Sequence, residues 1–177
     1  MGENVYRLLS FFDFFKKIPL HCLFSVVSLE HRTKLNHGEK TMQLLTTTRP
    51  SDFPAYTLQY LRRLANLTAR YCDRVDSEKD DYARERNYKF ALRCIFRIQA
   101  TLWDNAGKID NREERERLSK ISDALLGVWD ILSDRRAFSV SAYIGIIAVL
   151  SIKCVDNYDL YKTSFDCILS EIKQHTR

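Results

Sequence analysis

Apolar side chains recur at alternating steps of three and four residues from residue 51 to the end of the chain. This spacing places them on one face of an α-helix. The first such pattern predicts a helix that is capped by Ser51 and Asp52, holds Pro54 in its first turn and ends near residues 73–76. Its predicted apolar face consists of Phe53, Thr57, Tyr60, Leu64, Leu67 and Tyr71, with Leu61 and Val75 beside them.

Two further amphipathic helices are predicted. Ser77 and Asp80 resemble a capping box, and the helix after them is expected to end at Gly107. Its broad apolar face would hold Tyr88, Leu92, Ile95, Phe96, Leu102 and Trp103. Nothing in the sequence decides whether this helix is separate from the first or continuous with it through a bend. Asp110 and Glu113 predict the start of a third helix, whose apolar residues are Leu118, Ile121, Leu125, Val128 and Leu132.

The segment 137–152 is different because its 16 residues include no charged side chain. A helix that is apolar on every side is either the central helix of a bundle or a membrane span. Sixteen residues fall short of the roughly 18 that indicate a span, and Lys153 ends the run. We therefore expect a buried central helix at about 137–155, and a membrane anchor at 137–152 is the alternative. Small residues at Ser141, Gly145 and Ala148 would let another helix approach closely in either setting.

The last helix is predicted to be capped by Asp156 or Asn157, with Tyr158, Tyr161, Phe165, Ile168 and Ile172 on its apolar face. All three prolines lie in the first third of the chain, and only three glycines follow them. A β fold needs such residues at its reversals. The sequence therefore predicts one all-α domain over residues 51–177, a bundle of four to five helices.

Residues 1–41 do not share this periodicity. They contain an aromatic run at 11–15, then two lysines, then 12 uncharged residues at 18–29. Twelve residues are too few for a transmembrane helix, which takes roughly 20. A signal peptide is one interpretation, although the Phe-rich start and the internal proline and histidine are not typical of one. We expect this segment to be irregular or non-native.

Our preferred interpretation of residues 1–41 is that translation begins at Met42. Gly38 and Glu39 can be encoded by GGAGAA, a purine-rich sequence of the kind that bacterial ribosomes bind, at a suitable distance before a Met42 codon. The hypothesis leaves a protein of 136 residues, encoded by a bacterium, a phage or another mobile element.

Composition narrows the classes of function only slightly. The formal charge of +5 arises from 28 Lys and Arg against 23 Asp and Glu. This balance is compatible with a nucleic-acid or an acidic protein partner and is diagnostic of neither. The five cysteines form no closely spaced pair, which argues against a zinc site. Four of them lie in apolar helical patterns, so we expect reduced, buried thiols and a cytoplasmic protein.

Catalytic motifs are not evident. From Met42 onward the only histidine is His175, near a C-terminus that we expect to fray. Hydrolases, phosphorelay modules and most zinc enzymes depend on an imidazole held in a packed site. No glycine-rich phosphate loop is present, and the paired carboxylates at 80–81 and 113–114 lie at predicted helix starts, where the helix dipole explains them. We therefore expect no enzyme, cofactor or metal, although a mechanism based on carboxylates or tyrosines escapes these arguments.

The candidate binding residues are basic and form two stripes. The first lies on the second predicted helix, where no acidic residue intervenes between Asn87 and Gln99, and consists of Arg86, Lys89, Arg93 and Arg97. The second lies on the first helix and consists of Arg63, Arg70 and Arg74. If the two helices pack side by side, the stripes converge near Tyr56, Tyr71 and Tyr82. Arginine donates hydrogen bonds in a planar arrangement that fits phosphate, and tyrosine can stack on bases. An ordinary solvated helix face explains the same pattern, and nearby acids would repel phosphate.

Three functional hypotheses follow. The leading one is a non-catalytic, regulatory interaction protein that presents a helix face to another protein or to a second copy of itself. The second is a nucleic-acid-binding protein that uses the two basic stripes. The third is a membrane-associated protein anchored by the helix at 137–152.

Overall fold

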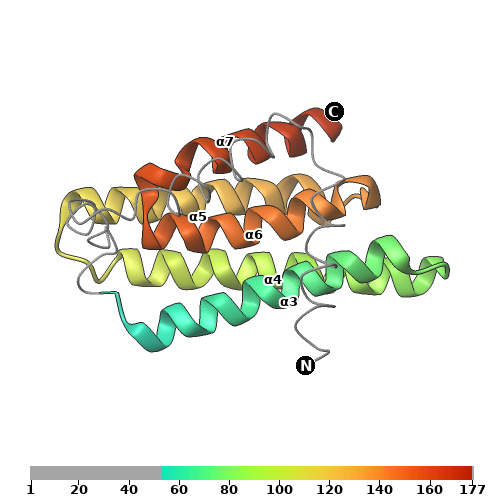
Figure 1. Cartoon of the computed structure of the whole chain (residues 1–177), viewed down its shortest axis with the longest axis horizontal. Helices are drawn as coiled ribbons and strands as arrows, with labels where there is room; N and C mark the ends of the chain where they lie inside the picture. The colour runs from blue at the N-terminus through green and yellow to red at the C-terminus, as the bar shows by residue number, and fades with distance from the viewer. Residues whose placement is uncertain (1–52, 177) are drawn as a thin grey trace, which may run out of the picture.

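The computed structural model describes residues 53–176 of the chain. This part forms a bundle of long helices (Figure 1) and contains no strand. Its elements are the α-helices α3 (Ala55–Ser77), α4 (Asp81–Ala106), α5 (Arg112–Ser133), α6 (Ser141–Asp156) and α7 (Tyr158–His175), and the short 3-10 helix η1 (Phe138–Val140). The all-α prediction is confirmed. Both the segment 1–41 and the hypothesis of a start at Met42 lie outside the described residues.

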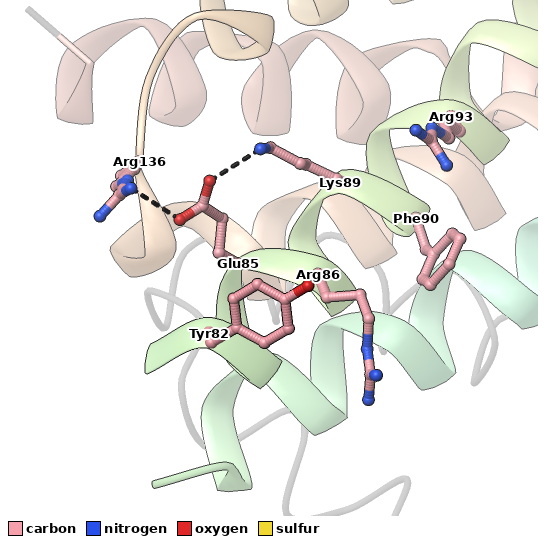
Figure 2. Close-up of a pocket in the computed structure, with 7 residues that line it drawn as sticks. All are labelled: Tyr82, Glu85, Arg86, Lys89, Phe90, Arg93 and Arg136. Carbon is pink, nitrogen blue, oxygen red and sulfur yellow. Dashed lines mark ion pairs between the residues drawn. The ribbon is translucent and has the colours of Figure 1, made fainter. Parts of the chain in front are cut away.

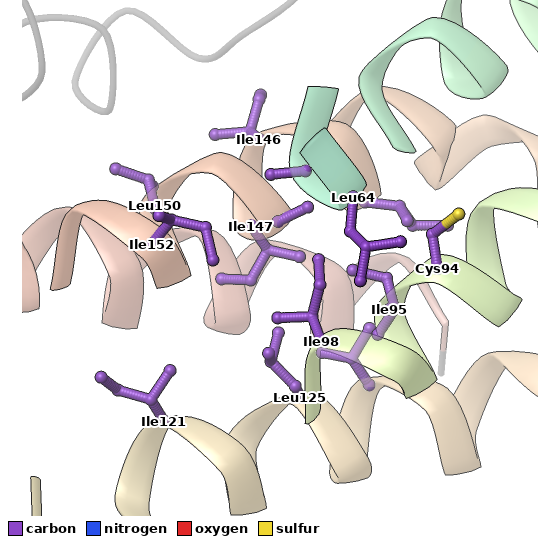
Figure 3. Packing of buried hydrophobic residues seen from close by; sticks show 14 of the residues in the cluster. Leu64, Cys94, Ile95, Ile98, Ile121, Leu125, Ile146, Ile147, Leu150 and Ile152 are labelled. Atoms are coloured by element: carbon purple, nitrogen blue, oxygen red, sulfur yellow. The ribbon is translucent and has the colours of Figure 1, made fainter. Parts of the chain in front are cut away.

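Helix α6 occupies the centre of the bundle. It contacts each of the four other α-helices, most extensively α3 and α7. Twelve of its sixteen residues are buried, because a helix without a polar face is stabilised by neighbours on every side. Figure 3 shows Ile147 of α6 close to Ile98 of α4 and Leu125 of α5, all of them fully buried. The predicted apolar central helix is therefore present.

The segment Phe138–Asp156 is, by its length and composition, also able to cross a membrane. It has 19 residues and a mean hydropathy of 2.0, and 78% of its 18-residue apolar stretch is buried inside the bundle. These bounds agree with the central helix expected at about 137–155. The segment is longer than the uncharged run 137–152 because the helix continues past Lys153 to Asp156.

Helix α3 buries only part of the predicted face: Thr57, Leu61, Leu64 and Val75 are buried as expected. Tyr60 and Leu67 are 44% and 39% exposed, although we expected both on the apolar face. The buried side instead includes the small residues Ala65, Thr68 and Cys72. These residues allow α4 and α6 to pack closely against α3, and this packing turns the larger Tyr60 and Leu67 outward.

Helices α4 and α5 agree better with their predicted faces. All five predicted apolar residues of α5 are buried. On α4, Phe96 and Trp103 are 42% and 56% exposed, so the predicted face was too broad there. The Phe96 ring packs against Trp129 of α5 at a centroid distance of 5.1 Å, at the edge of the contact between the two helices.

Helices α4, α5 and α7 each begin at a residue whose side chain caps the helix. The capping box predicted at Ser77 is wrong. Asp80 is the N-cap of α4, and its carboxylate accepts a hydrogen bond from the Ala83 amide at 2.8 Å. Asn111, not Asp110, caps α5. Asn157, one of two predicted candidates, caps α7. Each side chain satisfies an amide that has no partner within its helix.

Helix α3 has no such cap. Pro54 is its N-cap residue and makes no side-chain hydrogen bond, and the helix begins at Ala55. The predicted caps Ser51 and Asp52 lie outside the described residues. Helices α3 and α4 are separate, because Glu78–Asp80 lies between them and the Asp80 cap starts a new helix.

The cysteine prediction is confirmed for Cys72, Cys94 and Cys154, which are buried and free. It is wrong for Cys167, which is half-buried and disulfide-bonded.

The expectation of a frayed C-terminus is also wrong. Helix α7 extends to His175, whose ring stacks on Tyr143 with centroids 5.6 Å apart. The imidazole Nε2 lies 3.6 Å from a Glu171 carboxylate oxygen.

Candidate interaction surface on helices α3 and α4

All seven predicted basic residues are exposed. On α4, the residues Arg86, Lys89, Arg93 and Arg97 lie opposite the side that holds Ala91, Ile95 and Ile98 in the core. On α3, Arg63, Arg70 and Arg74 likewise lie away from the buried residues. The two stripes are therefore both on the outside of the bundle.

The antiparallel packing of α3 and α4 brings the two stripes alongside each other. Two contacts set the register: the Arg84 Nε donates to the Val75 carbonyl at 3.2 Å, and the Tyr71 and Phe90 rings stack at 5.3 Å. This register places paired stripe residues at the same level along the two helices: Arg74 with Arg86, and Arg63 with Arg97. We call the exposed side chains along this seam the α3–α4 surface, which comprises the seven predicted basic residues with Tyr56, Tyr60, Leu67, Tyr71, Tyr82 and Phe90.

A four-residue row crosses the seam of the α3–α4 surface. The Arg74 guanidinium lies 5.8 Å from the Tyr71 ring centroid, and the Arg93 guanidinium lies 5.5 Å from the Phe90 ring centroid. With the Tyr71–Phe90 stack between them, one cation from each stripe is held against an aromatic ring. Each contact is favourable because the ring face carries partial negative charge.

The α3–α4 surface also exposes aromatic and apolar area. Tyr56 and Tyr82 are each 76% exposed, at the two opposite ends of the seam. Tyr60 and Leu67 lie between them on α3 and are partly exposed. Tyrosine and arginine are enriched among the residues that dominate binding energy at protein interfaces.

An open hollow of about 360 Å³ lies at one end of the surface (Figure 2). Its lining combines four cations, one acid and two rings: Arg86, Lys89, Arg93, Arg136, Glu85, Tyr82 and Phe90. Arg136 comes from the connector between α5 and η1, and reaches the hollow from the side opposite Arg86. No local sequence pattern indicates that Arg136 would join the α4 stripe.

Glu85 connects two of the cations in the hollow. Its carboxylate lies 2.7 Å from Lys89 Nζ and 2.8 Å from an Arg136 guanidinium nitrogen. The hydrogen bond from Lys89, followed by the charge of Arg136, lowers the pKa of Glu85 below its ordinary value. Arg86 and Arg93 form no ion pair with any residue in 53–176.

The acids that we expected to oppose an anionic partner are partly occupied. Asp80 caps α4, and Asp81 forms an ion pair with Arg84 at 3.3 Å. Asp76 accepts a hydrogen bond from the Ser141 hydroxyl on α6. All three lie near the α3–α4 turn.

No protein-family model, curated protein or solved structure matches this chain. Within residues 53–176, no three His, Cys, Asp or Glu side chains are grouped as a metal ion would require. The function is therefore inferred from the chemistry of the α3–α4 surface.

Proposed function

We propose that this domain is a non-catalytic interaction protein whose α3–α4 surface binds an acidic segment of another protein. The observation that carries the proposal is the Arg74–Tyr71–Phe90–Arg93 row, which joins both basic stripes across the seam. Cations that are already held against rings lose less side-chain freedom when they bind a partner.

The surroundings of the row favour a protein over nucleic acid. Tyr60 and Leu67 add apolar area along α3, which an interface core uses and a phosphate backbone does not. The uninterrupted positive stripe of α4 is the observation in favour of nucleic acid, which is the second candidate.

The charge of the surface argues against a second copy as its occupant. A symmetric dimer formed through this surface would place the arginines of one copy against those of the other. Like charges facing each other across an interface are unfavourable. The partner is therefore expected to be acidic and different from this chain. The burial of α6 within the bundle likewise favours a core helix over a membrane anchor.

A pull-down from the native source, with mass spectrometry after nuclease treatment, tests the proposal. The test variant is Arg70→Glu with Arg74→Glu, and the matched control is Lys108→Glu with Lys120→Glu, which changes the net charge equally at exposed sites outside the surface. We expect the wild type and the control to retain the same acidic protein and the test variant to lose it.

Two results would contradict this function. Equal retention by the test variant would remove the surface from the interaction. Binding that disappears on nuclease treatment and falls steeply with salt would favour the nucleic-acid candidate.

A further inference from the structure

The hollow at the end of the α3–α4 surface has more cations than its own acid can neutralise. Glu85 interacts with Lys89 and Arg136, and Arg86 and Arg93 have no acidic partner among residues 53–176. Four cationic side chains around one hollow therefore face a single carboxylate. A ligand that satisfies them has more than one negative charge or more than two acceptor oxygens.

A phosphate monoester meets this requirement. It carries about −1.5 to −2 charges at neutral pH and offers three strong acceptor oxygens. Arginine donates to such a group through two parallel N–H bonds. The hollow supplies three arginines from two separate segments of the chain. Their guanidinium groups point in different directions (Figure 2), so an anion bound here would draw them together by rotation of their exposed side chains.

The walls of the hollow indicate what carries the phosphate. Tyr82 and Phe90 stand eight residues apart on α4, on either side of Arg86. Aromatic rings pack favourably against another ring in offset or edge-on geometry. The hollow, at about 360 Å³, has room for a phosphorylated aromatic side chain.

We propose that this hollow binds a phosphotyrosine side chain of the partner protein, with Arg86, Arg93 and Arg136 as phosphate ligands and Tyr82 and Phe90 as ring contacts. The proposal rests on the function inferred above, because it specifies the anionic group of the partner. In the free protein the Glu85 carboxylate interacts with Lys89 and with Arg136, one of these three arginines, so the phosphate competes with Glu85 for Arg136.

Titration calorimetry on the whole chain, with phenyl phosphate as the probe, tests the site. Because both the ring and the dianion contribute, we expect phenyl phosphate to bind at least about tenfold more tightly than either benzoate or inorganic phosphate. Replacing Arg86 or Arg136 by alanine removes one charge-assisted contact and is expected to weaken phenyl phosphate by about tenfold. The control Lys120→Ala, on α5, is expected to leave the affinity unchanged.

The Glu85→Gln variant is expected to change the affinity for phenyl phosphate in the opposite direction. Removing the competing carboxylate frees Lys89 and Arg136, so we expect tighter binding of phenyl phosphate. Weaker binding in this variant would overturn the competing role of Glu85. Equal binding of benzoate and phenyl phosphate would overturn the phosphate assignment. Inorganic phosphate as tight as phenyl phosphate, or adenosine monophosphate more than about tenfold tighter, would overturn the phosphotyrosine assignment.

Phosphatase treatment of the partner separates this proposal from the proposed function. If the partner remains bound after treatment and is unaffected by Arg86→Ala, but is lost with Arg70→Glu and Arg74→Glu, the hollow is not a phosphotyrosine site and the surface still binds the partner. Loss of the partner both after phosphatase treatment and with Arg86→Ala supports the phosphotyrosine site as well as the proposed function.

Discussion

The Tyr71 ring of α3 and the Phe90 ring of α4 stack with centroids 5.3 Å apart and planes inclined by 29°. This contact couples the packing of α3 and α4 to the geometry of the α3–α4 surface, because each ring also contacts an arginine. A single aromatic pair thus contributes both to stability and to the placement of Arg74 and Arg93.

The first prediction concerns this pair. In a double-mutant cycle with Tyr71→Leu and Phe90→Leu, we expect a favourable coupling of about 0.5–1.5 kcal/mol in the free energy of unfolding. Urea denaturation of the four proteins measures it. A coupling near zero would show that the rings contribute only their buried area and do not interact specifically.

The corrected face of α3 gives a matched pair of leucines. Leu61 is fully buried and Leu67 is 39% exposed. We expect Leu61→Ala to lower the free energy of unfolding by about 2–5 kcal/mol, because it leaves a cavity in the core. Leu67→Ala is expected to change it by less than about 1 kcal/mol. Chemical denaturation measures both variants. Equal losses in the free energy of unfolding would contradict the exposure of Leu67 and support the face predicted from the sequence.

This correction shows what the pattern of α3 could and could not predict. Its three-and-four spacing identified a helix, but large apolar side chains on two adjoining arcs offered two choices of buried face. The buried arc contains Ala65, Thr68 and Cys72, whose small size allows close approach of neighbouring helices. Only the packing of α4 and α6 decides between the arcs. Helix α5 has a single apolar arc, and there the prediction was correct.

The candidate surface was predictable only where it follows one helix. Arg86, Lys89 and Arg93 recur at helical spacing, so the sequence alone placed them on one side of α4. Arg136 lies some forty residues further along the chain, in a connector whose path depends on how α5 packs against α4. The stack of Tyr71 on Phe90 likewise depends on the register between two helices, which no local pattern specifies.

The ion pairs of Glu85 give a prediction for pH. Because the pKa of Glu85 is lowered in the folded protein, its contribution to stability is present above the pKa of the unfolded chain and is lost as pH falls through the folded pKa. Replacing Lys89 by methionine is expected to raise the pKa of Glu85 toward its ordinary value, as measured by carboxyl NMR titration.

Glu116 is the internal control for that titration. Its pKa is lowered by the hydrogen bond from Arg112 on the same helix, so Lys89→Met is expected to leave it unchanged. If the pKa of Glu85 stays low in the Lys89→Met variant, Lys89 is not the main cause of its shift.

The buried thiols give a prediction at alkaline pH. Burial raises the pKa of Cys154 to about 12, and the thiolate is the reactive form. We expect Cys154 to resist iodoacetamide at pH 8 in the folded protein and to react once urea unfolds the chain, as read by peptide mass spectrometry. Rapid labelling in the absence of denaturant would contradict the burial of α6.

The same shift has a consequence for stability. Since the unfolded thiol ionises at lower pH than the folded one, the unfolded state binds fewer protons above its own pKa, and the stability contributed by Cys154 falls as pH rises from about 9 toward 12. Tyr88, whose pKa burial also raises to about 12, adds to the same trend from about pH 10 upward.

Site-specific photo-cross-linking in the native host tests the binding function of the α3–α4 surface most directly. A benzophenone amino acid at Leu67 reports on the surface, and the same group at the exposed Asp123 on α5 is the control. We predict a discrete covalent adduct with one acidic protein from position 67, none from position 123, and loss of the adduct when Arg70 and Arg74 are changed to glutamate. The same adduct from both positions, an adduct with nucleic acid, or an adduct that survives the charge reversal would contradict the account.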